Sequence, residues 1–163
     1  MTIPTPPAAV WVHDGLRVGP SAIAGDGLFA AADLPAGTVV LRLGGQVVPT
    51  AELDRRIAAA DADPAAPYVD TVALGPDAHL VLPPGTAAHC GNHSCDPTLA
   101  PAGPYELATR RAVAAGTELA VDYARLSGPG FTLTCSCGAA GCRGTITGET
   151  RRFPWADDPP PSP

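Results

Sequence analysis

Short apolar segments, interrupted every few residues by glycine or proline, limit what this 163-residue chain can fold into. Its 18 glycines and 20 prolines leave few runs long enough for a helix, because both residues break regular elements. One helix is predicted over residues 51–62, capped by Thr50, with Leu53 and Ile57 on one face. Strands are predicted at residues 10–18, 38–43, 46–48, 68–74, 79–82, 106–113 and 118–123. The pattern predicts a mostly β fold and excludes a parallel nucleotide-binding sheet, which needs alternating strands and helices.

The two ends of the chain are predicted to lie outside the folded domain. Residues 1–9 are rich in proline, threonine and alanine, and residues 148–163 form a proline-rich tail. We expect 1–9 and 153–163 to be disordered, because they offer little apolar surface to offset chain entropy. No run approaches the roughly 18 apolar residues of a membrane span, and no secretion leader is apparent. A cytoplasmic location is therefore expected.

The charge balance favours a basic partner over nucleic acid. The formal net charge is −6, and all ten basic residues are arginine. Phosphate neutralisation requires clustered basic residues, so direct nucleic-acid binding is not expected. An acidic chain is better suited to attracting a basic protein.

Three of the five cysteines have metal-ligand spacing. Cys135, Cys137 and Cys142 form a C-x-C-x4-C pattern with glycines that let the loop wrap around an ion. Zinc in a closed structural site takes four tetrahedral ligands, so a fourth must come from elsewhere in the chain. The candidates are Cys90 and Cys95, with His89 and His93 as weaker ones. An odd cysteine count without a secretion leader favours metal or free thiols over disulfides.

Four segments in sequence order resemble the SET-domain protein-lysine methyltransferases. They are GDGLFA at 25–30, NHSCDP at 92–97, ELAVDY at 118–123 and the cysteine loop that ends in CRG at 142–144. The resemblance implies a fold of several small β-sheets with a knot-like crossing of two late segments. It places the catalytic SET domain at 10–130 and a zinc-binding post-SET loop at 131–147. It also implies S-adenosyl-L-methionine as methyl donor and a narrow channel for the target amine.

The resemblance assigns a cofactor site and a zinc site to named residues. Glycine at two positions of the first motif lets backbone approach a ligand closely. The implied zinc ligands are Cys95, Cys135, Cys137 and Cys142, which leaves Cys90 as a spare thiol. The implied cofactor-binding residues are Gly25, Asp26, Gly27, Leu28, Asn92, His93, Tyr123 and Phe131.

The chain departs from the family pattern at two places. Asp26 stands where the family often has a basic or aromatic residue, and this acid is expected to weaken cofactor affinity. The residues before Asn92 are His89, Cys90 and Gly91, where the family usually has Arg-Phe and a β-branched residue.

The implied catalytic residues are Tyr123 and, in the channel, Tyr68. The hydroxyl of Tyr123 would orient the amine and balance the sulfonium charge. Val121 stands where the family has a Phe or Tyr that limits methylation, so multiple methylation is expected. Phe131 is a candidate to stack on adenine or to line the channel, and ordinary packing is the alternative.

The predicted function is methyl transfer from S-adenosylmethionine to the lysine amine of a basic protein. Two alternatives stay open: methylation of a small amine or peptide, and a degenerate SET fold that binds a partner without catalysis. A monomer or a homodimer is compatible with the sequence.

Overall fold

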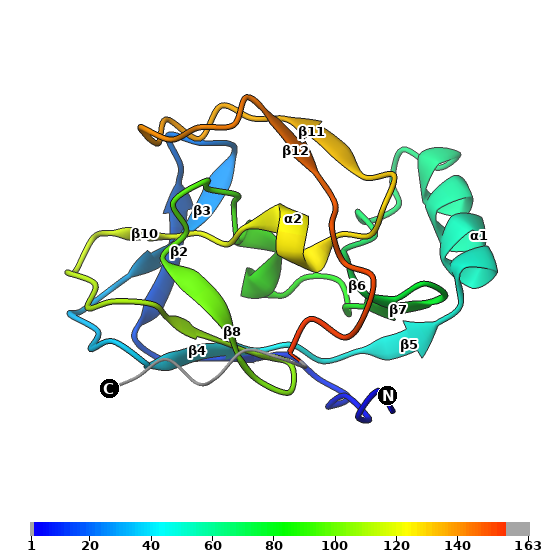
Figure 1. Ribbon diagram of the computed structural model, residues 1–163, viewed down its shortest axis with the longest axis horizontal. Helices are drawn as coiled ribbons and strands as arrows, with labels where there is room; N and C mark the ends of the chain where they lie inside the picture. Colours follow the sequence, from blue (N-terminus) through cyan, green and yellow to red (C-terminus); the bar gives the residue numbers. More distant parts are fainter. Residues whose placement is uncertain (1, 156–163) are drawn as a thin grey trace.

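Antiparallel pairing of short strands builds the protein, described here for residues 2–155 of a computed structural model (Figure 1). A four-stranded sheet has the order β1 (Trp11–Val12), β4 (Val39–Arg42), β9 (Glu106–Thr109), β8 (Leu99–Gly103). The first three-stranded sheet has the order β10 (Glu118–Leu119), β3 (Asp26–Ala30), β2 (Leu16–Pro20). The second has the order β5 (Gln46–Val48), β7 (Ala78–Val81), β6 (Thr71–Gly75). A two-stranded ribbon pairs β11 (Thr132–Thr134) with β12 (Thr145–Thr147). The mostly β prediction is confirmed.

Helices are few and short, as the glycine and proline content predicts. The longest, α1, covers Thr50–Asp61, and a second, α2, covers only Tyr123–Leu126. A 3₁₀ turn, η1, covers Ala87–Cys90. The predicted role of Thr50 as a cap is wrong: Pro49 is the N-cap residue and makes no side-chain cap bond. Instead the Thr50 backbone N–H donates to Asp77 Oδ1 at 2.8 Å, so another part of the chain satisfies the helix end.

The core fills the space between the sheets with aliphatic side chains from several strands. Residues with no exposed surface come from three different sheets: Leu28, Ala30, Val40, Leu80, Ala108 and Leu119. Both faces of β3 and β6 are largely buried, because small sheets enclose one another. The core therefore holds the strands and the loops between them at fixed positions, and the motifs lie on both.

Both ends of the described chain are folded, which corrects two predictions of disorder. Near the N-terminus, the Pro7 carbonyl accepts a hydrogen bond from Gly45 N–H and the Pro4 carbonyl accepts one from the Tyr105 hydroxyl. At the other end, Phe153 and Trp155 are buried against Tyr105, and Trp155 Nε1–H donates to the Glu106 carbonyl at 2.6 Å. Aromatic burial offsets the chain entropy there. The remaining tail, 156–163, lies outside the described residues.

Two long strand predictions are also corrected. Residues 10–18 form β1 and β2 with a turn between them, and β10 ends at Leu119. Beyond β10, Val121 pairs in parallel with His93 through an isolated bridge, and Tyr123 begins α2. The second and third motifs therefore lie side by side, where the family resemblance places its crossing. Within residues 2–155, no helix has the length and apolar character needed to cross a membrane.

Candidate functional site

The glycine loop between β2 and β3 is shaped by two glycines with different tasks. Gly25 has a φ of +46°, a left-handed conformation that glycine adopts without strain. Its carbonyl accepts a hydrogen bond from Ser21 N–H at 2.8 Å, which closes the loop. At Gly27, an added Cβ would lie 2.4 Å from Glu118 Oε1. Glycine is needed there because the Glu118 carboxylate occupies the space of a side chain.

Asn92 and Glu118 tie this loop to the second and third motifs. Asn92 Nδ2 donates to the carbonyls of Ala24 and Asp26, at 3.0 and 3.2 Å, and to Glu118 Oε1 at 2.9 Å. The Ser21 hydroxyl donates to the same carboxylate at 2.8 Å. Three segments far apart in sequence therefore meet at one carboxylate. Glu118 opens the third motif but was not among the predicted site residues, because its contact with Asn92 spans 26 positions and leaves no local sequence signal.

The other predicted residues of the first motif face different surroundings. Asp26 is exposed, and only its backbone carbonyl takes part in the Asn92 network. Leu28 has no exposed surface and packs within the core, so its side chain cannot contact a ligand. A cofactor contact from Leu28 would have to come from its backbone.

His93 is buried and connects the second motif to Tyr123. The Tyr123 N–H donates to His93 Nδ1 at 3.1 Å, and the two rings lie 5.4 Å apart. Because Nδ1 accepts, the neutral imidazole carries its proton on Nε2, which lies 3.4 Å from Cys95 Sγ. Burial lowers the pKa of His93, and this favours the neutral ring. His93 therefore acts as a hydrogen-bond donor to the Cys95 sulfur.

The Tyr123 hydroxyl is held in a fixed place by backbone. It donates to the Gly91 carbonyl at 2.8 Å, and the Phe131 ring lies edge-on at 6.4 Å. Burial, followed by the nearby charges of Asp70 and Tyr68, raises the pKa of Tyr123 to about 12. The hydroxyl therefore stays protonated at neutral pH and donates to the Gly91 carbonyl.

A cavity of about 680 Å³ opens beside this hydroxyl. Its lining includes Tyr123, Phe131 and the apolar face of α1, with Leu53 and Ile57. Tyr68 also lines it, but the residue is 82% exposed and lies at the surface. The structure thus brings both predicted tyrosines to one cavity, with Tyr123 half-buried and Tyr68 exposed.

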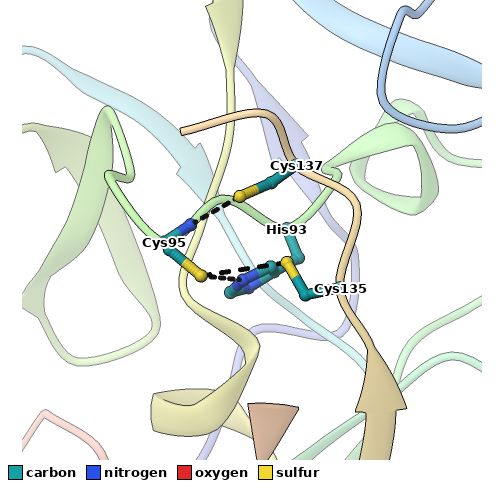
Figure 2. Close-up of side chains that lie close together, drawn as sticks. All are labelled: His93, Cys95, Cys135 and Cys137. Atoms are coloured by element: carbon teal, nitrogen blue, oxygen red, sulfur yellow. Dashed lines mark hydrogen bonds between the residues drawn. The ribbon is translucent and has the colours of Figure 1, made fainter. Parts of the chain in front are cut away.

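Four side chains that could bind a metal ion lie close together: His93, Cys95, Cys135 and Cys137 (Figure 2). Ligand atoms of His93, Cys95, Cys135 and Cys137 all lie within 4.8 Å of one another. The Cys95 and Cys135 sulfurs are 3.8 Å apart, which matches the about 3.8 Å between sulfurs around tetrahedral zinc with bonds of about 2.3 Å. Burial opposes ionisation of Cys137, but N–H donors from Cys95 and Ala139 lower its pKa to about 6. The thiolate is the form that binds metal.

The fourth ligand is therefore a choice between His93 and Cys142. His93 is geometrically close, but its Nδ1 already accepts a hydrogen bond, so its Nε2 carries a proton. The Cys142 thiol lies 3.8 Å from the Cys135 carbonyl, at the edge of the cluster. The sulfurs of Cys95, Cys135 and Cys137 are arranged as three ligands of a zinc ion would be, and Cys142 lies near them. Cys142 as the fourth ligand stays a prediction. Cys90 and His89 lie outside the cluster.

Comparisons with known proteins place the motifs in one family. A family model described as the SET domain matches residues 25–124. Among solved structures, the fold is similar to the methyltransferase domain of human histone-lysine N-methyltransferase SETMAR, with a TM-score of 0.63 and 22% sequence identity. That alignment covers 85% of this chain and 59% of the other chain. No curated protein sequence matches this chain significantly.

Proposed function

This chain belongs to the SET-domain family of methyltransferases, and from that premise we propose that it methylates the lysine amine of a basic protein with S-adenosyl-L-methionine. The observation that carries the proposal is the place of Tyr123. Tyr123 lines the cavity and its hydroxyl donates to the Gly91 carbonyl, and the neighbouring Asn92 holds the glycine loop. On this proposal, the sites for the amine and for the cofactor adjoin at two consecutive residues, Gly91 and Asn92.

The glycine loop and Asn92 are the residues that would hold the cofactor. S-adenosylmethionine supplies a methyl group activated by a sulfonium. The loop offers backbone groups without side chains, and the Asn92 amide oxygen can accept from an ammonium group. The Glu118 carboxylate adds a negative charge close to the loop. This combination suits a ligand with both ammonium and sulfonium charges.

Tyr123 and the cavity walls would prepare the amine. A protonated hydroxyl fixed by the Gly91 carbonyl offers its oxygen lone pairs to an incoming N–H group and so sets the direction of the amine. Leu53, Ile57 and Phe131 line the cavity with apolar surface that excludes water and favours the uncharged amine. These residues orient and desolvate, and none of them needs to act as a strong base.

The substrate class rests on charge and on the size of the cavity. The chain carries a net charge of −6, and Asp61 and Asp70 line the cavity. A cavity of about 680 Å³ has room for a lysine side chain together with part of its peptide. Both features support a basic protein as substrate. We also propose that zinc, held by Cys95, Cys135, Cys137 and Cys142, fixes the segment that carries Phe131.

Two measurements test the proposal separately. Isothermal titration with S-adenosylmethionine is expected to show saturable binding, and no binding at millimolar cofactor contradicts any methyltransferase function. Incubation with methyl-labelled cofactor and a fractionated cell extract is expected to label protein bands that release methyl-lysine on hydrolysis. Label confined to the small-molecule fraction contradicts a protein substrate.

A further inference from the structure

His89, on the wall of the cavity, makes two short contacts with oxygen atoms. Its Nδ1 lies 2.7 Å from Asp70 Oδ2, and its Nε2 lies 3.0 Å from the Pro83 carbonyl oxygen. Both Asp70 and His89 line the cavity that contains Tyr123. Their side chains are mostly buried, with exposed fractions of 25% and 20%.

These two contacts define the charge of the histidine. A neutral imidazole has one N–H donor, whereas a carboxylate oxygen and a carbonyl oxygen are both acceptors. Against an ionised Asp70, a neutral His89 would therefore direct a nitrogen lone pair at one of them. Only the imidazolium form donates to both, so the geometry indicates a positively charged His89 paired with a negatively charged Asp70.

The contacts of His89 with Asp70 and Pro83, here called the clamp, link the β6–β7 hairpin to η1. Asp70 precedes β6 and Pro83 follows β7, and the Leu82 N–H donates to the Asp70 carbonyl at 3.0 Å across this hairpin. His89 belongs to η1, which ends one residue before Gly91. The Gly91 carbonyl is the acceptor that holds the Tyr123 hydroxyl. The hairpin therefore fixes η1 through His89, and η1 fixes Tyr123 through Gly91.

We propose that His89, as an imidazolium clamped between Asp70 and Pro83, is a positioning residue that holds the Gly91 carbonyl and thereby the catalytic Tyr123 hydroxyl. This inference rests on the proposed methyltransferase function. It gives a role to one of the positions where the chain departs from its family, because His89 stands where the family usually has arginine. Arginine is a permanent cation with several donors, so His89 supplies the same chemistry with a proton that can be lost.

The ion pair also sets the charge of the cavity wall. Burial raises the pKa of Asp70, and the hydrogen bond from His89 opposes this effect. An unpaired Asp70 carboxylate would hold the substrate amine in its ammonium form, which is not nucleophilic. Other ionisable groups face the same region: Asp26 on β3, which packs against η1, and Asp61, Tyr68, His79 and Tyr123 around the cavity.

Two variants separate the clamp from simple packing. His89→Arg keeps a cation with two donors, and His89→Gln keeps a similar size with no charge. We expect H89Q to lower kcat/KM for methyl transfer by about tenfold or more, since Asp70 is left buried and unpaired. H89R is expected to restore much of this loss. If H89R is as impaired as H89Q while both melt like the wild type, the proposed role of the cation is wrong.

The pH dependence gives a readout that packing alone would not change. Kinetics are measured from pH about 6 to about 9.5, because histidine can lose its charge by deprotonation whereas arginine keeps it. Deprotonation of the substrate amine and titration of the other groups affect wild type and H89R alike. The kcat/KM of the wild type divided by that of H89R therefore isolates the effect of His89. We expect this ratio to fall by about fivefold or more as the pH rises, because the wild type loses one donor. A flat ratio contradicts the positioning role.

NMR distinguishes failure of this inference from failure of the proposed function. In ¹⁵N-histidine-labelled protein, the His89 signals are assigned by their absence from H89R. Both ring nitrogens are expected to be protonated at neutral pH, without any need for methyl transfer. A neutral tautomer at neutral pH overturns the clamp, whereas a charged His89 in a protein that transfers no methyl group overturns the proposed function and leaves the clamp intact.

Discussion

The central sheets and the cysteine segment, residues 131–147, are stabilised by different kinds of interaction. Leu28 and Leu119 pair across β3 and β10 with no exposed surface, and they belong to a continuous apolar core. In the ribbon of β11 and β12, all three residues of β11 are exposed and Ile146 is the buried residue of β12. Figure 1 shows this ribbon at one edge of the molecule, away from β4 and β8.

The difference indicates that the central sheets stabilise the fold, whereas the cysteine segment completes the site. The core alone can hold the glycine loop and the Asn92 network, because both rest on central strands. The cysteine segment has little apolar burial, yet it begins at Phe131, which lines the cavity beside Tyr123. Its order therefore depends on the cysteine cluster, on the ribbon and on the ion pair of Arg143 with Asp122. Loss of the cluster should disturb the site without unfolding the core.

The largest expected effect is the loss of the proposed zinc ion from the cysteine cluster. Structural zinc contributes about 10–16 kcal/mol in small zinc-folded peptides, far more than the few contacts that the segment makes otherwise. Removal of zinc with a chelator, or Cys135→Ser, is expected to abolish hydrogen-exchange protection in 132–147 and to preserve it in β3 and β9. Cys90→Ser is the control, because Cys90 lies outside the cluster. Equal protection of 132–147 with and without metal would contradict this division.

The second effect compares two leucines of the two regions. Leu28→Ala is expected to lower the free energy of unfolding by about 2–5 kcal/mol, because it leaves a cavity in the core. Leu133 on β11 is 38% exposed, so Leu133→Ala is expected to cost less than about 1 kcal/mol. Urea unfolding of both variants with metal bound measures the difference. Similar losses in the two variants would show that the segment shares the main core.

The third effect concerns the carboxylate beneath the glycine loop. Glu118→Gln preserves the size of the side chain and removes the charge that accepts from Asn92 and Ser21. Hydrogen bonds to charged groups contribute about 1.5–3 kcal/mol, so the cofactor affinity is expected to fall by about tenfold or more. Glu52→Gln on α1, where the carboxylate pairs with surface arginines, is the matched control. Calorimetric titration measures the cofactor affinity of both variants. Equal affinities for E118Q and E52Q would contradict a role of the Glu118 carboxylate in cofactor binding.

The smallest effect is the ionisation of Tyr123. Burial raises its pKa to about 12, so the hydroxyl keeps its proton while the pH rises through the neutral range. Ultraviolet titration of phenolate, as the difference between wild type and Tyr123→Phe, is expected to show no Tyr123 ionisation below pH about 10. A phenolate signal near neutral pH would instead make Tyr123 a base.

The sequence predicts the parts of the site whose chemistry needs particular residue types. The spacing of Cys135, Cys137 and Cys142 gave the metal prediction, and the family resemblance added Cys95 and the Asn92–His93 pair. The structure brings Cys95, Cys135 and Cys137 together. β8 was missed because Pro101 and Gly103 interrupt its apolar pattern, although this strand pairs with β9. Burial of Phe153 and Trp155 was missed because it depends on Tyr105, almost 50 residues away in sequence.

Residues that act through long-range contacts gave no local signal. Glu118 meets Asn92 across 26 positions, and Asp70 meets His89 across 19, so neither partnership can be read from spacing. The departure from the family at His89 was visible in the sequence, but its meaning required the positions of Asp70 and Pro83. Such pairs are determined by topology, which brings distant loops to one side of the core.

The central claim is that Tyr123 directs methyl transfer from the wall of the cavity. The most direct test measures transfer of labelled methyl groups to a basic protein by the wild type, Tyr123→Phe and Tyr105→Phe. Tyr105 is a matched control, because its hydroxyl donates to the Pro4 carbonyl and the residue does not line the cavity. We predict that Y123F lowers kcat by about 100-fold or more while Y105F stays near the wild type. Equal rates for Y123F and Y105F would contradict the account.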